Sequence, residues 1–209
     1  TCDEALMTPK ALPNQPVEGN WECRPGPMLA GWDFYGVMPR LTQKAVEWLG
    51  QQQGGGKPFF LYFPFTSPHA PIVPAAEFRG KSQAGGYGDY VVQTDWTVGQ
   101  VLQALETNGF ARNTLVIFSA DNGPEHYAYP RIQNFGHRSS GPLRGLKRDI
   151  WEGGHRVPFF VRWPGVVQPG TVSDGLISQI DVMATFAAII GYRLPSTAAG
   201  DSFDQLAAL

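Results

Sequence analysis

Apolar residues recur at helical spacing in three stretches of the chain. Residues 39–50 place their large apolar side chains on one face, and this stretch begins at a proline, which suits the first turn of a helix. Residues 87–107 and 181–190 show the same periodicity. Asn108-Gly109 follows the first of these stretches and Gly191 follows the second, where such residues can end a helix. The pattern therefore predicts helices over the three ranges.

The helix predicted over residues 87–107 should bury one mainly apolar face. The side chains on that face are those of Val91, Thr94, Val98, Val101, Leu102 and Leu105. Asp95 lies in the middle of the same helix, and we interpret it as a hydrogen-bond anchor for a neighbouring loop rather than as a catalytic group.

Short continuous apolar runs at residues 59–63, 114–119 and 159–163 predict strands that are covered on both faces. The order strand, helix, strand builds a parallel sheet. We therefore predict an α/β fold with a largely parallel or mixed sheet flanked by helices on both faces, incomplete within this chain. Residues 1–38 are rich in proline, glycine and polar groups and form a loop-rich segment, and residues 39–209 form the α/β core portion of the same single domain.

Composition excludes several classes of partner. The 209 residues carry a formal charge of −2, which gives no electrostatic footprint for nucleic acid. No apolar run approaches the roughly 20 residues that span a bilayer. Only 16% of residues are charged, so we expect much of the chain to lie inside a larger structure. Cys2 and Cys23 permit one disulfide or none, and Thr1 in place of an initiating methionine indicates an internal segment.

The segments beside the predicted strands contain the candidate chemistry. His69 lies between two prolines after the first strand, although a single loop histidine is usually an ordinary surface residue. Asp121 and Asn122 follow the second strand and offer hard oxygen ligands for Ca²⁺ or Mg²⁺, but Asp-Asn-Gly is also common turn chemistry. Lys147 precedes a paired-glycine turn, where backbone can approach an anion closely. Taken singly, none of these features decides the function.

Their order along the chain resembles the sulfatase family of the alkaline-phosphatase superfamily over nearly the whole length. The segments that carry the resemblance are Ser67-Pro68-His69-Ala70-Pro71, Gly86-Tyr87-Gly88-Asp89-Tyr90, Asp121-Asn122-Gly123-Pro124-Glu125, Gly145 and Lys147 with Trp151-Glu152-Gly153-Gly154, and Ile180-Asp181-Val182-Met183-Ala184-Thr185. Five ordered blocks with compatible spacing are far more specific than one short pattern.

The resemblance implies hydrolysis of a sulfate ester, by a formylglycine beside Ca²⁺, on a small molecule or a sulfated glycan. It implies that Asp121 and Asn122 are ligands of the Ca²⁺, with Mg²⁺ as a possible substitute. It places His69 at the leaving group and Lys147 against the sulfate. His137 lies in a loop that should cover the pocket, and we expect it to contact the substrate. Glu152 and Arg156 should brace the turn that carries Lys147.

The chain departs from the family in lacking its nucleophile motif, Cys/Ser-x-Pro-x-Arg. Cys23-Arg24-Pro25 copies only the first half of that motif, and we interpret it as a coincidence. The formylglycine is therefore expected upstream of this chain, and residues 1–209 alone should be inactive. The family resemblance also implies export to a periplasm, the cell exterior or a lysosome, and it leaves the oligomeric state open.

Two alternative functions share much of this framework. A phosphodiesterase or phosphonate hydrolase of the same superfamily would keep the metal and the histidine but use another nucleophile. A non-catalytic pseudoenzyme would bind metal or sulfated glycans and turn nothing over.

Overall fold

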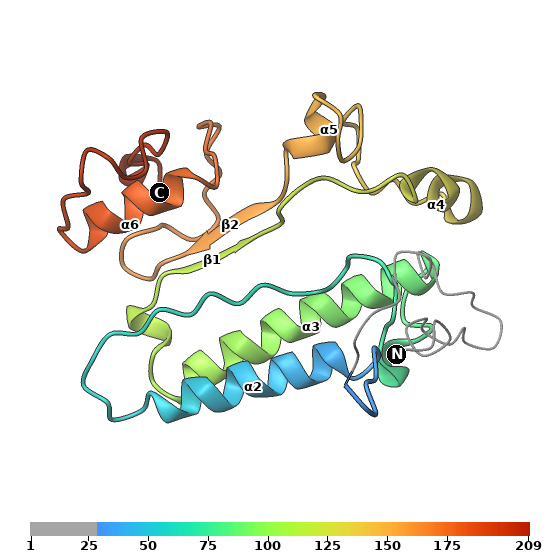
Figure 1. The fold of residues 1–209 in the computed structure, drawn as a ribbon, viewed down its shortest axis with the longest axis horizontal. Helices are drawn as coiled ribbons and strands as arrows, with labels where there is room; N and C mark the ends of the chain where they lie inside the picture. Colours follow the sequence, from blue (N-terminus) through green and yellow to red (C-terminus); the bar gives the residue numbers. More distant parts are fainter. Residues whose placement is uncertain (1–28) are drawn as a thin grey trace. The chain divides into compact units, whose positions relative to one another are not determined.

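Two long helices dominate the first part of the chain in the computed structural model, which describes residues 29–209 (Figure 1). Helix α2 (Val37–Gln51) and helix α3 (Gly85–Thr107) lie side by side and run in the same direction. The Thr42 and Thr97 hydroxyls share a buried hydrogen bond of 2.9 Å between them. Both predicted helices are confirmed, and each begins two residues before its predicted start.

The buried face of α3 is more polar than the sequence pattern predicted. Asp89, Gln93 and Thr97 are fully buried, with 0% of their surface exposed, whereas Val91 is 39% exposed. The reason is that α3 packs against loops as well as against α2. Buried side chains that bind loop backbone must be polar, because unpaired backbone N–H groups are costly to bury.

Asp89 is the anchor that the sequence analysis assigned to Asp95. Its two carboxylate oxygens accept hydrogen bonds from the backbone N–H groups of Gly80 (2.7 Å) and Ser82 (2.8 Å). Asp95 itself is exposed. The predicted loop anchor on this helix therefore exists, but it lies nearer the start of α3.

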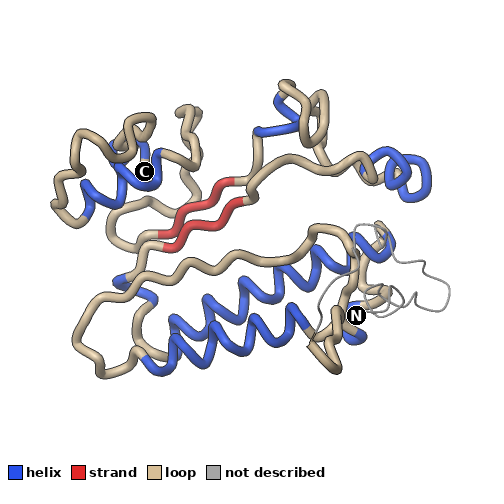
Figure 2. Tube along the Cα trace, in the orientation of Figure 1, coloured by secondary structure: helices blue, strands red, loops and turns tan. Residues whose placement is uncertain are grey.

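The strand predicted over residues 59–63 is wrong. This segment is extended and runs along α3, but it pairs with no strand among the described residues (Figure 2). Its side chains alternate between half-buried and exposed, and the Phe59 ring packs against Trp48 and Phe110 at centroid distances of 5.7 and 5.1 Å. The apolar run thus covers helix surface instead of filling a sheet.

The other two predicted strands are confirmed as β1 (Val116–Ser119) and β2 (Phe159–Arg162). They pair antiparallel, with Val116 opposite Arg162. This pairing agrees with the mixed form of the predicted sheet and not with the parallel form. The strands belong to a second compact unit, residues 112–119 with 158–209, whereas residues 29–111 and 120–157 make up the described part of the first.

Helix α6 (Asp181–Ile189) confirms the last predicted helix. Its first residue is a hydrogen-bond hub for the C-terminal segment. Asp181 accepts hydrogen bonds from the N–H groups of Phe203 (2.9 Å) and Ser178 (3.0 Å) and from the side chain of Gln205 (3.1 Å). The backbone bonds, that of Phe203 first, hold the pKa of Asp181 below its ordinary value, because they stabilise the carboxylate form.

Several short elements were not predicted. They are α4 (Ala128–Phe135), α5 (Glu152–His155) and the 3-10 turns η2 (Ala76–Phe78), η3 (Ala111–Asn113) and η4 (Leu206–Ala208). Helices this short leave little periodicity to detect.

Within residues 29–209, no helix combines the length and apolar content that a membrane crossing needs. Most of the loop-rich segment predicted over 1–38, with Cys2 and Cys23, lies outside the described residues.

Candidate active site

Two loops of the first unit are tied together by their backbones. We call residues 120–126, which follow β1, the Asp121 loop, and residues 144–156, which precede β2, the Lys147 loop. The N–H of Gly123 donates to the carbonyl of Gly154 (2.8 Å), and the N–H of Lys147 donates to the carbonyl of Pro124 (2.8 Å). These two hydrogen bonds bring the predicted metal ligands and the predicted sulfate contact onto neighbouring backbone.

Glycines make this close approach possible. A Cβ added at Gly123 would lie 1.9 Å from the carbonyl oxygen of Gly153, and one added at Gly153 would lie 2.1 Å from that of Gly145. Gly145 also has a φ of +87°, a backbone conformation that other residues rarely adopt. The paired glycines of the sequence therefore allow backbone to pack on backbone between and within the two loops.

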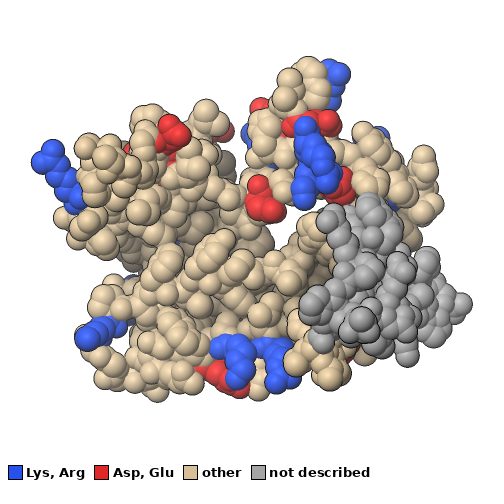
Figure 3. Space-filling model, viewed as in Figure 1, with Lys and Arg blue, Asp and Glu red and all other residues tan. Residues whose placement is uncertain are grey.

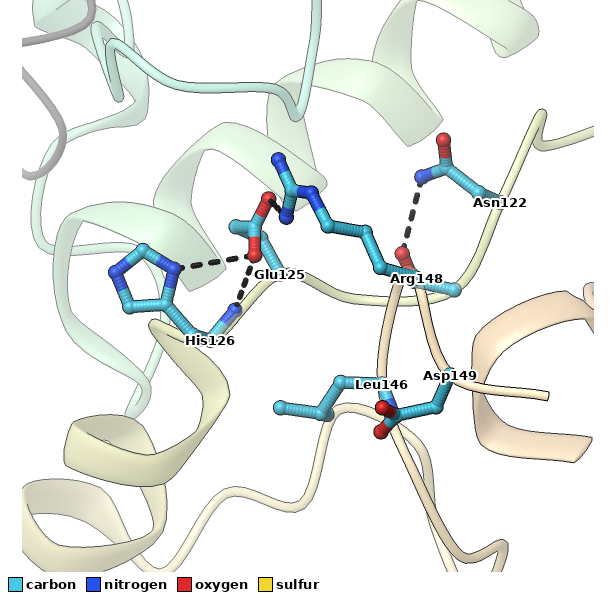
Figure 4. A network of polar contacts seen from close by, with 7 residues as sticks. Asn122, Glu125, His126, Leu146, Arg148 and Asp149 are labelled. Atoms are coloured by element: carbon cyan, nitrogen blue, oxygen red, sulfur yellow. Dashed lines mark hydrogen bonds and ion pairs between the residues drawn. The ribbon is translucent and has the colours of Figure 1, made fainter. Parts of the chain in front are cut away.

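The Lys147 loop holds its own shape through further contacts. Gly153 donates its N–H to the carbonyl of Arg144 (2.7 Å). The carboxylate of Asp149 accepts the N–H of Leu146 at 2.9 Å (Figure 4). Arg156 pairs with Glu152 at 2.9 Å within this loop, the two residues that the sequence analysis expected to brace it. Charged side chains of both signs gather over α5 and the loops beside it (Figure 3).

Asp121 and Asn122 offer oxygen ligands suited to a hard divalent cation. Asp121 is exposed and Asn122 is partly buried. The Asn122 side-chain N–H₂ donates to the carbonyl of Gly123 (3.0 Å), which fixes the amide with its oxygen pointing away from that carbonyl (Figure 4). These two side chains can supply some of the oxygen ligands of a Ca²⁺ ion, which binds about six to eight oxygens. No group of three His, Cys, Asp or Glu side chains that could hold a metal occurs among residues 29–209.

Glu125, in the Asp121 loop, is the centre of a charged network. Its carboxylate pairs with the guanidinium of Arg148 and accepts the N–H of His126 at 2.9 Å, and the His126 ring Nδ1 lies 3.1 Å away (Figure 4). Burial pushes the pKa of Glu125 upward, but the hydrogen bonds from Arg148 and His126 outweigh it and lower the pKa to about 2. Glu125 therefore stays charged well below neutral pH.

Sequence reasoning missed this network. Glu125 and Arg148 are 23 residues apart, and each would ordinarily be interpreted as a solvated loop charge. The available signal was their position, because Arg148 follows Lys147 directly and Glu125 ends the sequence block that begins with Asp121 and Asn122. Arg148 also adopts a φ of 79°, which is uncommon outside glycine.

His69 is anchored to α3 through its own loop. Ser67 Oγ, two residues before it, accepts a buried hydrogen bond of 2.8 Å from Thr94 Oγ1 on α3. The His69 ring Nδ1 lies 2.6 Å from the carbonyl of Ala70, and the peptide bonds before Pro68 and Pro71 are cis. The contact through Ser67 ties the His69 loop to α3.

His137 also lies against α3. Its ring centroid is 5.7 Å from that of Tyr87, and the guanidinium of Arg131 lies 3.5 Å over the same tyrosine ring. Arg131 is only 4% exposed, so it packs α4 onto the start of α3. The structure thus joins Asp121, Asn122 and Lys147 across two bonded loops. It packs His137 against α3 and ties the loop of His69 to α3 through Ser67. Their predicted roles stay predictions.

The Sulfatase family profile matches residues 11–192. The chain belongs to the sulfatase family. The resemblance inferred from the sequence blocks is thereby confirmed, and proteins of this family hydrolyse sulfate esters.

Sulfatases with different named substrates are similar to this chain. It is 38% identical over 181 residues to an N-acetylgalactosamine-6-O-sulfatase of Bacteroides thetaiotaomicron, covering 84% of this chain and 34% of that protein. It is 39% identical over 175 residues to the steryl-sulfatase of Rattus norvegicus, covering 83% of this chain and 30% of that protein. The chain thus spans about a third of the length of these sulfatases.

Solved structures confirm the fold class. A protein described with the metabolism of multiple glycosaminoglycans by Bacteroides thetaiotaomicron superposes with a TM-score of 0.78 and 37% identity, over 85% of this chain and 37% of its own. Ps i-CgsB in complex with k-i-k-neocarrahexaose superposes with a TM-score of 0.73 and 28% identity. The match covers 82% of this chain and 38% of that one. This sulfatase therefore has the α/β, alkaline-phosphatase-like fold that the sequence predicted.

Proposed function

We propose that the intact protein hydrolyses a sulfate ester and that the Asp121 and Lys147 loops bind its sulfate end. The observation that carries this proposal is the pair of backbone hydrogen bonds between the loops. They hold a carboxylate, an amide oxygen and an ammonium group on neighbouring backbone. This combination suits a divalent cation and a tetrahedral anion side by side.

Asp121 and Asn122 would hold Ca²⁺ in this site, with Mg²⁺ as the alternative. When bound, the cation would supply Lewis-acid polarisation of a sulfate oxygen. Lys147 would hold the sulfate and offset the negative charge that develops on the leaving oxygen. His69 would donate a proton or a hydrogen bond to the departing alkoxide. The nucleophile, a formylglycine in this proposal, would come from outside these 209 residues.

We favour a sulfated sugar as the substrate. Two of the similar proteins have names or descriptions that concern sugar sulfates or glycosaminoglycans. Residues 132–156 carry five Lys and Arg against two Asp and Glu, and two of the four histidines of the chain. Such a rim suits a polar, anionic substrate better than a steroid. His137, packed on Tyr87, would contact the sugar.

The test is an assay of the intact protein expressed from its native open reading frame. We expect release of sulfate from an aryl sulfate and from a sulfated N-acetylhexosamine, with little release of phosphate from the matching aryl phosphate. We expect residues 1–209 alone to release none, because they lack the nucleophile motif. Preferential cleavage of a phosphodiester or phosphonate would favour the other hydrolase. Stabilisation by Ca²⁺ without any turnover would favour the pseudoenzyme.

Export is a further proposal, to a periplasm, the cell exterior or a lysosome. It is supported by the family resemblance alone. The acid-resistant charge of Glu125 is compatible with an acidic compartment but does not select one.

A further inference from the structure

The two bonded loops carry four carboxylates, two on the Asp121 loop and two on the Lys147 loop. Three of them have partners: Glu125 binds Arg148, Asp149 binds the N–H of Leu146, and Glu152 binds Arg156. Lys147 is partly buried, and within the described residues its ammonium has no carboxylate partner. Lys147 thus lies on a loop pair with four carboxylates and makes an ion pair with none of them.

Among these carboxylates, Glu125 is the one whose neighbour in the chain, Pro124, is hydrogen-bonded to Lys147. The backbone N–H of Lys147 binds the carbonyl of Pro124, so Glu125 is the next residue along the facing backbone. A lysine has a flexible four-carbon stem that can reach a carboxylate on a neighbouring residue of the facing backbone. Instead, the side chain of Arg148 reaches Glu125 and contacts its carboxylate (Figure 4).

The Glu125 carboxylate is fully engaged by this arrangement. One oxygen receives the guanidinium of Arg148, and the other receives the backbone N–H and the ring of His126. Guanidinium also binds carboxylate more selectively than ammonium does, because it is planar and offers donors in a fixed fork. The backbone at Arg148 holds a φ of 79°, and this unusual conformation accompanies the contact.

We propose that Arg148 keeps Lys147 available for an anion by holding Glu125, the carboxylate that would otherwise pair with Lys147. Arg148 is then a positioning residue that acts through Glu125 and does not itself touch substrate. The identity of the anion, a substrate sulfate, rests on the proposed function. The competition between Arg148 and Lys147 for Glu125 does not.

The test compares Arg148→Gly, Glu125→Gln and the double variant in the intact protein. Glycine suits this site because it accepts the positive φ without strain. The first readout is the rate at which an amine-acylating reagent modifies Lys147, measured by mass spectrometry. An ammonium held by a carboxylate loses its proton less readily, so Arg148→Gly should slow labelling about 2- to 5-fold, the size of an exposed ion-pair effect. The double variant should recover the wild-type rate within about 2-fold.

Two internal controls accompany the labelling. Exposed Lys57 should react equally in all variants. Glu47→Gln removes a carboxylate that binds Lys44 at 2.7 Å on α2, and it should leave the labelling of Lys147 unchanged.

The second readout is the affinity for inorganic sulfate, with kcat and KM for an aryl sulfate. Arg148→Gly should weaken sulfate binding and raise KM, each by about 2- to 5-fold. Arg148→Lys should restore both values, since lysine can still hold Glu125. The double variant should also recover, although it lacks the ion pair. A merely structural role predicts the opposite, because removing both partners would leave the loops at least as disturbed as removing one.

Two results would overturn the inference. Unchanged Lys147 labelling in Arg148→Gly would show that Glu125 does not reach Lys147. Slow labelling that persists in the double variant would show that Arg148 acts through loop structure. If the labelling follows the expected pattern but no sulfate ester is cleaved, the proposed function fails and the inference stands.

Discussion

Replacing Lys147 with alanine should lower turnover of a sulfate ester by the intact protein about 10²- to 10³-fold, the usual effect of removing one donor that stabilises transition-state charge. The fold should survive the change, because the structural contact of Lys147 is its backbone N–H bond to Pro124, which alanine retains. Steady-state kinetics and a thermal melt of the same preparation measure the two quantities.

The matched control for this variant is Lys44→Ala on α2. Lys44 is exposed and pairs with Glu47 on its own helix, so its loss should leave turnover unchanged. Wild-type turnover in Lys147→Ala would remove Lys147 from the mechanism. A large drop in melting temperature would instead show that its side chain supports the loop.

Replacing Gly123 with alanine should separate the Asp121 loop from the Lys147 loop. The added Cβ would lie 1.9 Å from the Gly153 carbonyl oxygen, which belongs to the backbone and has little freedom to move. We expect a loss of about 3 kcal/mol in the free energy of unfolding, the upper range for overpacking, together with loss of turnover. Chemical denaturation and the sulfate-release assay measure these effects.

Gly99→Ala is the matched control. Gly99 lies in the middle of α3, and a Cβ there would meet nothing within 4 Å. Because alanine favours a helix over glycine by up to about 1 kcal/mol, this variant should be as stable as wild type or slightly more stable. If Gly123→Ala keeps both stability and turnover, the close packing of the two loops is not needed for the site.

The sequence pattern correctly predicted the elements that depend mainly on residues close to one another in the chain. Helices α2, α3 and α6 follow apolar periodicity, and strands β1 and β2 follow short apolar runs. The run at 59–63 was just as apolar, yet it forms no ladder among the described residues. A strand needs a partner from elsewhere in the chain, and no local pattern reveals whether that partner is present.

The face of α3 shows a second limit. Its pattern predicted burial of Val91, whereas the structure buries Asp89 and Gln93. Gln93 lies against the loop before α3, where its side-chain oxygen accepts the N–H of Ala75 at 2.9 Å. The sequence pattern predicts the helix but not which segments pack against each of its faces. Those neighbouring segments determine which polar side chains are buried.

The candidate site divides in the same way. Asp121, Asn122 and Lys147 were recognised because they lie in ordered sequence blocks, and the structure joins their loops. The pairing of Glu125 with Arg148 was missed, because it depends on the register between two loops. That register follows from glycine contacts such as Gly123 with Gly153, which the sequence shows only as glycines.

The most direct test of one anion site built from two loops is hydrogen exchange of the intact protein in Ca²⁺, with and without inorganic sulfate. We predict that sulfate slows exchange in peptides covering residues 120–126 and 144–156 together, while peptides from α2 do not change. Protection of only one of the two loops, or of neither at a sulfate concentration that inhibits turnover, would contradict the account.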